Sequence, residues 1–197
     1  MGVTTFLCFF FAWMPKIIDE AYDLILNSAK QKLFEEGYSA FSLRPVAMDC
    51  GIAVGTIYHY FENKDDLIAA VRLEDWKCAM VKMEIHCQAA TTLSDGLLSI
   101  YSAIDNFCGI YETIWSQSED HISVKILNTR RIQLQMRLNQ KIRELLQRFD
   151  RMEDFDLSLL LVQIILSSVL EKETSAKQFH KLILRLFPIY ADEPQER

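Results

Sequence analysis

The sequence is poor in residues that interrupt regular structure. Its 197 residues include only 6 glycines and 4 prolines, and the prolines stand at positions 15, 45, 188 and 194. No segment alternates apolar and polar residues over a useful length, which argues against strands, and no internal repeat or low-complexity linker divides the chain. Because 50% of the residues are hydrophobic, the chain is able to bury a core. These features predict an all-α protein.

Positive charge is also scarce. The sequence has 21 Lys and Arg against 27 Asp and Glu, a formal charge of −6, which argues against a protein that coats nucleic acid through many phosphate contacts. The five cysteines form no C-x-x-C pair and have no histidines at zinc-ligand spacing. No G-x-S-x-G, H-E-x-x-H or phosphate-binding glycine loop is present. The sequence therefore predicts no metal site, no cofactor and no enzyme, and a reduced, cytoplasmic protein.

The first thirteen residues, MGVTTFLCFFFAW, differ in composition from the rest of the chain. Residues 6–13 are continuously apolar, but this run of eight is far shorter than the ~20 residues that span a bilayer. A basic flank and a small-residue cleavage site are both lacking. We hypothesise that translation begins at Met14, so that residues 1–13 are an extra segment. A short membrane-surface anchor is the alternative interpretation.

From Pro15 onward the apolar residues recur with the period of a helix. Positions 18, 21, 25, 29 and 33 form one apolar stripe, and we expect this helix to end at Gly37, because glycine tolerates the left-handed conformation of many helix ends. The later part of the chain has the same period and contains no proline before position 188. Four long helices are expected there, over residues 93–118, 122–149, 156–170 and 176–190.

Two short helices are predicted between these long ones. Ser42 is the predicted cap of a helix that has Pro45 in its first turn, where the missing N–H removes no bond of the helix. A second short helix is expected over residues 54–61, and Asn63 followed by Asp66 is typical of the start of a longer helix. Two short helices joined by a glycine-containing turn form a helix-turn-helix unit.

The stretch CGIAVGTIYHYFENK, residues 50–64, combines glycines with hydrogen-bonding aromatic residues. In a helix-turn-helix protein the second helix enters the major groove, and hydroxyls donate hydrogen bonds to phosphate oxygens. With the preceding G-Y and the following acidic residue and Leu, the motif A-x-x-x-G-I-x-x-G-T-I-Y-x-Y-F-x-x-K resembles the DNA-binding domain of the tetracycline-repressor (TetR/AcrR) family, and the resemblance runs from Ile17 to Ala70. It implies a DNA-binding domain over residues 14–70 and a helical effector-binding and dimerisation domain over residues 71–197.

The resemblance implies which residues contact DNA and which form the small core beneath them. The implied core residues are Ile57, Phe61 and Leu67. The implied DNA-binding positions include base contacts and backbone contacts. They are Arg44, Ala53, Val54, Gly55, Thr56, Tyr58, His59, Tyr60 and Lys64. For His59 a base contact, a phosphate contact and no contact all remain open, and Arg44 is alternatively a solvated surface residue.

Ala53 departs from the family pattern. The family commonly has Ser or Thr at this position, which caps the recognition helix, and loss of such a cap costs typically ~1 kcal/mol. Residues 16–72 also carry six basic side chains against nine acidic ones. We therefore expect DNA binding that depends on a few placed contacts and on two domains acting together, and that weakens steeply with salt.

The second domain is expected to supply an effector pocket. Aromatic residues recur at steps of three and four along residues 101–115, and ligand sites are apolar and aromatic with few polar groups. The alternative is that these residues are ordinary core. The predicted pocket residues are Tyr101, Ile104, Phe107, Tyr111, Trp115, His121 and Met136.

The segment DLSLLLVQIILSSVL, residues 156–170, is apolar on nearly all sides and therefore needs to be covered on all sides. Together with the last helix, it is expected to pair with the same two helices of a second copy. The predicted dimer interface consists of Leu160, Ile164, Val169, Phe179, Ile183 and Leu186. A two-fold homodimer matches a palindromic operator.

The sequence thus predicts a DNA-binding transcriptional regulator, a repressor that a small-molecule effector releases from double-stranded DNA. A helical ligand-binding or adaptor protein with weakened DNA binding is the alternative, and Ala53 and the acidic balance favour it.

Overall fold

The computed structural model describes residues 4–115, 122–171 and 175–187 of the chain. Within these ranges it contains helices and no strands, which confirms the all-α class. The elements are α1 (Thr4–Ala40), α2 (Leu43–Asp49), α3 (Val54–Tyr60), α4 (Lys64–Ala89), α5 (Leu93–Trp115), α6 (Ile122–Arg148), the 3-10 helix η1 (Met152–Leu157), α7 (Ser158–Glu171) and α8 (Ala176–Leu186).

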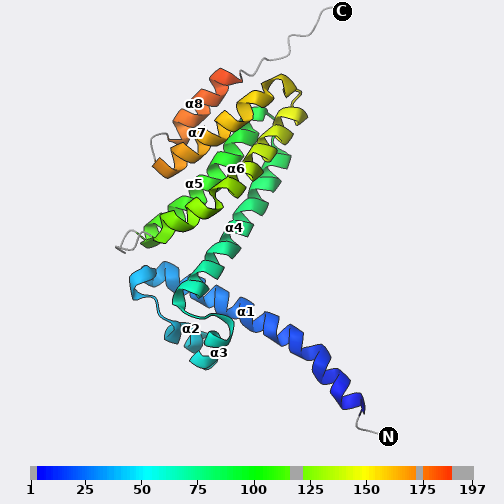
Figure 1. Ribbon diagram of the computed structural model, residues 1–197, viewed down its shortest axis with the longest axis vertical. Coiled ribbons are helices and arrows are strands. Elements are labelled where there is room, and N and C mark those ends of the chain that lie inside the picture. The colour runs from blue at the N-terminus through cyan, green and yellow to red at the C-terminus, as the bar shows by residue number, and fades with distance from the viewer. Residues whose placement is uncertain (1–3, 116–121, 172–174, 188–197) are drawn as a thin grey trace, which may run out of the picture. The chain divides into compact units, whose positions relative to one another are not determined.

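The chain folds as two compact units. Unit 1 contains α1, α2, α3, the part of α4 up to Asp75 and the end of α5 from Ile114. Unit 2 contains α4 from Trp76, α5 up to Thr113 and the later helices. The helix α4 is continuous over 26 residues and belongs to both units (Figure 1). The domain ranges inferred from the sequence stay predictions, and the division between the units falls inside this helix.

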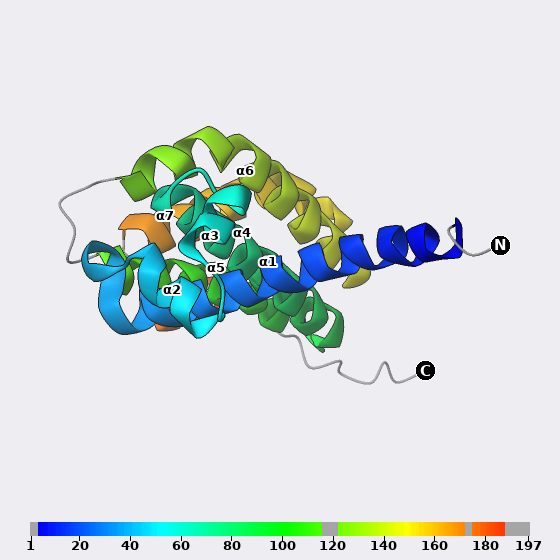
Figure 2. The same ribbon diagram turned by 90° about the horizontal axis from the view of Figure 1, so that it is seen from below.

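Unit 1 is built around α1. Ile25, Ala29 and Leu33 are fully buried on one face of α1, at the spacing expected for an amphipathic helix. They share the core of unit 1 with Val46 of α2 and Leu67 of α4. Figures 1 and 2 show α2 and α3 beside the second half of α1, whose first half extends beyond them. The core therefore holds the two short helices against the longer one.

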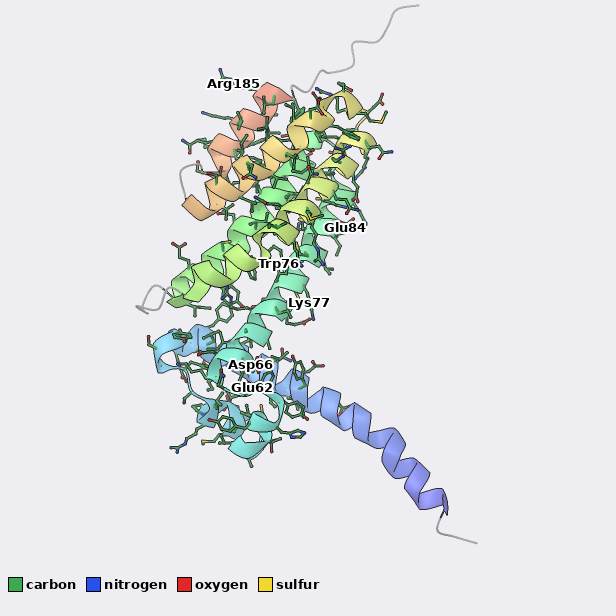
Figure 3. The ribbon with its side chains drawn as sticks, in the orientation of Figure 1. Glu62, Asp66, Trp76, Lys77, Glu84 and Arg185 are labelled. Atoms are coloured by element: carbon green, nitrogen blue, oxygen red, sulfur yellow. The ribbon has the colours of Figure 1, made fainter. Side chains whose placement is uncertain are left out.

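Several local predictions are confirmed in unit 1. Gly37 has φ +75° and interrupts the helical backbone of α1, and this is a conformation that glycine adopts without the steric cost of a side chain. The Asn63 side-chain oxygen accepts a hydrogen bond of 2.9 Å from the N–H of Asp66 at the start of α4. The Asp66 carboxylate accepts one from the backbone N–H of Glu62 at 3.2 Å, and both residues are labelled in Figure 3.

One prediction about a helix start is wrong, and a second is confirmed in position but not in its hydrogen bond. The helix α1 begins at Thr4 rather than at Pro15, and it continues through Pro15, whose missing N–H removes one bond of the helix. Ser42 stands at the N-cap of α2, but its side chain makes no capping hydrogen bond. The third residue of this helix is Pro45, which has no N–H that could donate a hydrogen bond to the serine oxygen.

In unit 2 the helix ends differ by a few residues from those predicted. The helix α7 begins at Ser158 rather than at Asp156 because residues 152–157 form η1. The helix α8 ends at Leu186, and the predicted end at Tyr190 lies outside the described residues.

An extensive apolar core holds unit 2 together. It draws residues from the second half of α4 and from α5, α6, α7 and α8. The rings of Tyr101 and Phe179 stack at its centre, with centroids 4.7 Å apart. At the end of α4, Arg148 donates hydrogen bonds to the carbonyl oxygens of Cys87 and Ala90, at 2.7 and 2.9 Å, so a cation satisfies acceptors that the helix leaves open.

None of the described helices is both long enough and apolar enough to cross a membrane.

Candidate nucleic-acid interface

The turn between α2 and α3 is closed by backbone hydrogen bonds. The N–H of Gly51 donates to the carbonyl of Met48 at 3.1 Å, and the N–H of Ile52 donates to the carbonyl of Ala47 at 3.0 Å. This is the Schellman arrangement, which requires a residue in the left-handed conformation, and Gly51 supplies it with φ +66°. The glycine therefore fixes the direction in which the chain leaves α2 and enters α3.

Buried residues anchor α3, the candidate recognition helix. Ile57 lies in the core of unit 1, and Phe61, immediately after α3, is also buried. The ring of Phe61 stacks on that of Tyr22 in α1, with centroids 5.3 Å apart. These positions confirm Ile57, Phe61 and Leu67 as core residues. Because the inner side of α3 is fixed in this way, its outer side is presented as a defined surface.

The outer side of α3 carries polar aromatic residues. Tyr58 is 56% exposed, and His59 next to it is also exposed. Tyr60 is half-buried, with its ring centroid 6.1 Å from that of Tyr22. Tyr58 and His59 are therefore the rings on α3 that are best placed to contact a partner.

Gly55 has no packing reason to be a glycine. A Cβ atom added there would have nothing within 4 Å, and its φ is not in the left-handed range. Thr56 and Val54 beside it are half-buried. The open space over Gly55 is the kind of surface that allows another molecule to approach the backbone closely.

Ala53 occupies the N-cap of α3, with φ −70° and ψ 145°, and provides no side-chain capping bond. The first N–H groups of a helix have no partners within it. At this helix start the N–H of Thr56 donates to the carbonyl oxygen of Ala53 at 2.9 Å, and the hydroxyl acceptor that Ser or Thr would supply is lacking.

The basic side chains of unit 1 are mostly engaged inside the unit. Lys30 pairs with Asp75, and Lys32 pairs with Asp49 at 3.1 Å, a hydrogen bond that raises the pKa of Lys32. Arg44 in α2 is exposed. Among the Lys and Arg residues of the described range 20–75, Arg44 alone makes no ion pair or hydrogen bond.

Lys64 lies at the start of α4, but its ammonium group points back to the link between α1 and α2. It donates hydrogen bonds to the carbonyl oxygens of Tyr38 and Phe41, at 3.0 and 3.4 Å. The same nitrogen lies 4.4 Å from the centroid of the Tyr38 ring. This placement differs from the backbone contact with DNA that the sequence predicts for Lys64.

The predicted effector residues of unit 2 do not surround a described cavity. Tyr101, Ile104, Phe107 and Tyr111 are buried, whereas Met136 is 68% exposed. The side chain of Trp115 and the whole of His121 lie outside the described residues. The structure has a surface pocket of about 470 Å³ at another place. It is lined by Asp105, Asn106, Cys108, Gly109, Ile110, Glu112 and Val169.

The predicted dimer residues are divided between the core and the surface. Val169, Phe179 and Ile183 are buried within one chain, so a second copy has no access to them in this structure. Ile164 is half-buried, whereas Leu160 is 59% exposed and Leu186 is 41% exposed. The sequence reasoning missed two other exposed apolar residues, Leu159 of α7 and Leu184 of α8.

The fold and the geometry of α2, the turn and α3 define a helix-turn-helix protein. Residues 25–71, which contain these elements, match the model of the bacterial regulatory proteins of the tetR family. This match falls on the same segment as the motif in the sequence.

Two relatives and one solved structure show how far the similarity extends. The HTH-type transcriptional regulator UidR of Escherichia coli (strain K12) is 36% identical over 58 residues, which are 29% of this chain and 30% of UidR. The fatty acid metabolism regulator protein of Bacillus subtilis (strain 168) is 26% identical over 126 residues, 64% of this chain and 60% of that protein. The chain thus matches less than a third of the length of UidR.

The similarity in fold extends further. The crystal structure of the transcriptional regulator FadR from Bacillus subtilis in complex with stearoyl-CoA superposes with a TM-score of 0.52 at 21% identity, over 84% of this chain and 96% of that one. At this level of identity the likeness concerns the fold.

Proposed function

We propose that the protein is a transcriptional regulator that binds a palindromic DNA operator as a homodimer and leaves it when a small molecule binds unit 2. One observation carries the proposal: in a segment that matches the tetR family, α3 exposes Tyr58 and His59 from a helix that Ile57 anchors. Phenolic and imidazole groups donate hydrogen bonds to phosphates and base edges in a groove. Open space over Gly55 supports a close approach of α3 to DNA.

The homodimer is proposed on the geometry of operators. A two-fold dimer presents two recognition helices to half-sites about 34 to 36 Å apart. The exposed leucines of α7 and α8, at positions 159, 160, 184 and 186, are the apolar surface that a second copy would cover. Sedimentation at micromolar concentration should give a dimer, and Leu160→Glu should shift it to the monomer. A monomeric wild-type protein would count against the proposal.

Regulation is proposed to act through a shift between two populations. An effector that binds unit 2 more tightly in one conformation favours that conformation, and the continuous helix α4 would convey the change to unit 1. The relatives suggest a first class of effector to test, because one is named for fatty acid metabolism and one was solved with stearoyl-CoA. We therefore propose acyl-CoA esters as the first compounds in a binding screen. Trp115→Ala and Tyr111→Ala test the predicted pocket.

The proposed activity is binding without a catalytic step, and it requires no metal or cofactor. A regulator of a bacterial chromosome acts in the cytoplasm, so we propose that location.

Selection of bound sequences from random duplex DNA by the full-length protein is the decisive experiment. We expect enrichment of a palindrome, whose affinity a mobility-shift titration then measures. The affinity of the double variant Tyr58→Ala, His59→Ala for the enriched sequence should be at least tenfold lower than that of the wild type. The reason is that each good base contact contributes about 1–3 kcal/mol. The matched control Leu73→Ala changes an exposed residue of the same unit away from α3.

The same selection distinguishes the second candidate, a helical ligand-binding or adaptor protein with weakened DNA binding. The uncapped start of α3 and the internal pairing of Lys30 and Lys32 favour it. A folded dimer that binds a ligand but enriches no sequence would establish this candidate and refute the proposed regulator.

A further inference from the structure

We propose that Lys64 positions the recognition helix by fastening the start of α4 to the α1–α2 link, and does not serve as a phosphate ligand. The inference deepens the proposed function, since the helix it positions is the proposed reader of DNA. Its evidence is the set of contacts that Lys64, Tyr38 and Asp65 make inside unit 1, which we call the Lys64 clamp.

The first half of the clamp is the ammonium group of Lys64. It donates hydrogen bonds to the carbonyls of Tyr38, in the last turn of α1 after the break at Gly37, and of Phe41, which follows α1. We call residues 38–42 the α1–α2 link. The Lys64 side chain is partly buried, and its nitrogen lies over the Tyr38 ring, where a cation is attracted to the electron-rich face. A charge-assisted bond to a carbonyl contributes more than a neutral one. The ammonium therefore holds the path of the chain from α1 into α2.

The second half of the clamp runs in the opposite direction. The Tyr38 hydroxyl donates a hydrogen bond of 2.8 Å to the carboxylate of Asp65, the residue after Lys64. Two consecutive residues of α4 are thus joined to one residue of the link, one as donor and one as acceptor. Such reciprocal bonds fix an orientation as well as a distance.

The position of the clamp explains why it bears on α3. The recognition helix ends at Tyr60, and only residues 61–63 separate it from Lys64. Phe61 is buried, and Asn63 and Asp66 cap the start of α4. Both ends of the segment that contains α2 and α3 are therefore tied to each other, one through the link at Tyr38 and the other through α4.

A phosphate oxygen would have to compete with two carbonyls and an aromatic ring for the same ammonium group. Loss of these contacts would free the link, and the binding energy would then partly be consumed in reordering it. Arg44, in contrast, is exposed and reaches DNA without releasing an internal contact. The two cations are therefore expected to behave differently when each is removed.

The first test uses the full-length protein without DNA. Hydrogen–deuterium exchange over residues 38–43 should become about tenfold faster in Lys64→Met, the factor expected for loss of a charge-assisted hydrogen bond. Tyr38→Phe keeps the ring and removes the hydroxyl, so it should raise exchange in the same segment by a smaller factor. If Lys64→Met fails to fold, Tyr38→Phe still decides the question. Lys82→Met, an exposed lysine further along α4, is the control of equal charge change and should leave the segment unchanged.

The second test measures affinity for a mixed-sequence duplex, and for any palindrome that selection recovers, at several salt concentrations. A lost phosphate contact lowers the slope of log K against log salt by about 0.9. We expect this reduction in slope for Arg44→Met, and we expect that variant to leave hydrogen–deuterium exchange over residues 38–43 unchanged. For Lys64→Met we expect weaker binding with an unchanged slope.

Unchanged exchange in both Lys64→Met and Tyr38→Phe would overturn the clamp, and so would a slope reduced by about 0.9 in Lys64→Met. The exchange measurement contains no DNA. If the wild-type protein binds no duplex, the proposed regulator fails while the exchange result still decides whether the clamp exists.

Discussion

Unit 1 and unit 2 are both helical, but different interactions hold them in shape. In unit 1 the helices α2 and α3 have 7 residues each, and the connections before, between and after them are fixed by particular bonds at Lys64, Gly51 and Asn63. In unit 2 longer helices pack around a continuous apolar core. Short helices cannot be stable alone, so unit 1 depends on a few specific residues, whereas unit 2 depends on the volume and pattern of many.

This difference explains why the sequence of unit 1 contains a recognisable motif and the sequence of unit 2 does not. A residue that makes a specific bond cannot be exchanged freely, and a string of such residues is a motif. Apolar core residues exchange with one another at modest cost if their total volume is kept. Unit 2 therefore has a recognisable class but no recognisable signature.

The largest expected effect is in the core of unit 2. Phe179→Ala removes a ring that is 0% exposed and stacks on Tyr101, and such a change costs about 3–5 kcal/mol. Urea unfolding followed by circular dichroism measures the loss. Leu186→Ala on the same helix is the control, with an expected cost below about 1 kcal/mol if the protein is measured as a monomer. Equal costs for the two variants would contradict the described core.

The second effect tests how strongly α3 depends on its buried residue. Ile57→Ala should destabilise unit 1 by about 2–4 kcal/mol. It should also abolish DNA binding, because the buried side of α3 holds the exposed side in position. Hydrogen exchange should become faster in residues 43–61 while the core of unit 2 stays protected. If protection falls equally in both units, their stabilities are not separate.

The third effect should be a gain. Ala53→Ser supplies the missing acceptor at the start of α3, which stabilises a helix by about 1 kcal/mol, a factor of about five in the population of ordered helix. Mobility-shift titration should show tighter DNA binding, and exchange at the N–H of Gly55 should slow. Ala53→Val, which adds no acceptor and ranks with alanine at an N-cap, is the control. Unchanged binding and exchange in Ala53→Ser would show that the start of α3 is already ordered.

The smallest effect concerns acid stability in unit 2. The hydrogen bond from Lys141 lowers the pKa of Glu84 below 4.5, its ordinary value. A carboxyl with a lowered pKa in the folded state stabilises the protein above its unfolded pKa, and this contribution is lost as the pH falls through the folded value. Between about pH 5 and pH 3, the melting temperature of Glu84→Gln should therefore fall less than that of the wild type.

Glu20→Gln, at an exposed residue of unit 1, is the control for Glu84→Gln and should follow the wild type. A parallel fall in all three proteins would exclude a contribution from the Glu84–Lys141 pair. Glu84 is labelled in Figure 3.

The sequence predicted most of the fold, because helix periodicity, Gly37, Gly51 and Asn63 are local signals. It placed the start of α1 wrongly because nothing local marks a helix start at Thr4. The sequence predicted a capping bond at Ser42 because serine is a good hydrogen-bond acceptor at a helix start. The bond is absent, since Pro45 has no N–H to donate to it. Of the candidate interface, the exposed Tyr58 and His59 followed from the motif. The internal use of Lys64 did not, since the carbonyls of Tyr38 and Phe41 reach it only through the tertiary fold.

In unit 2 the sequence could not separate residues that face the core from those that face outward. Phe179 and Ile183 fit a dimer stripe as well as a core stripe, because both require apolar residues at helical spacing. The structure buries them within one chain. Only the partner of a helical face decides between these roles, and that partner lies far away in the sequence.

The pairing of lysines with carboxylates in unit 1 has a consequence for how the protein would search a genome. A regulator meets about 10⁶–10⁹ competing sites for each operator, and unspecific attachment to them is almost wholly electrostatic. Because Lys30 and Lys32 are neutralised by Asp75 and Asp49, this protein should spend little time on arbitrary DNA. The proposed regulator would then reach an operator chiefly by diffusion through the cell interior rather than by sliding, and a small number of molecules would suffice to keep the site occupied.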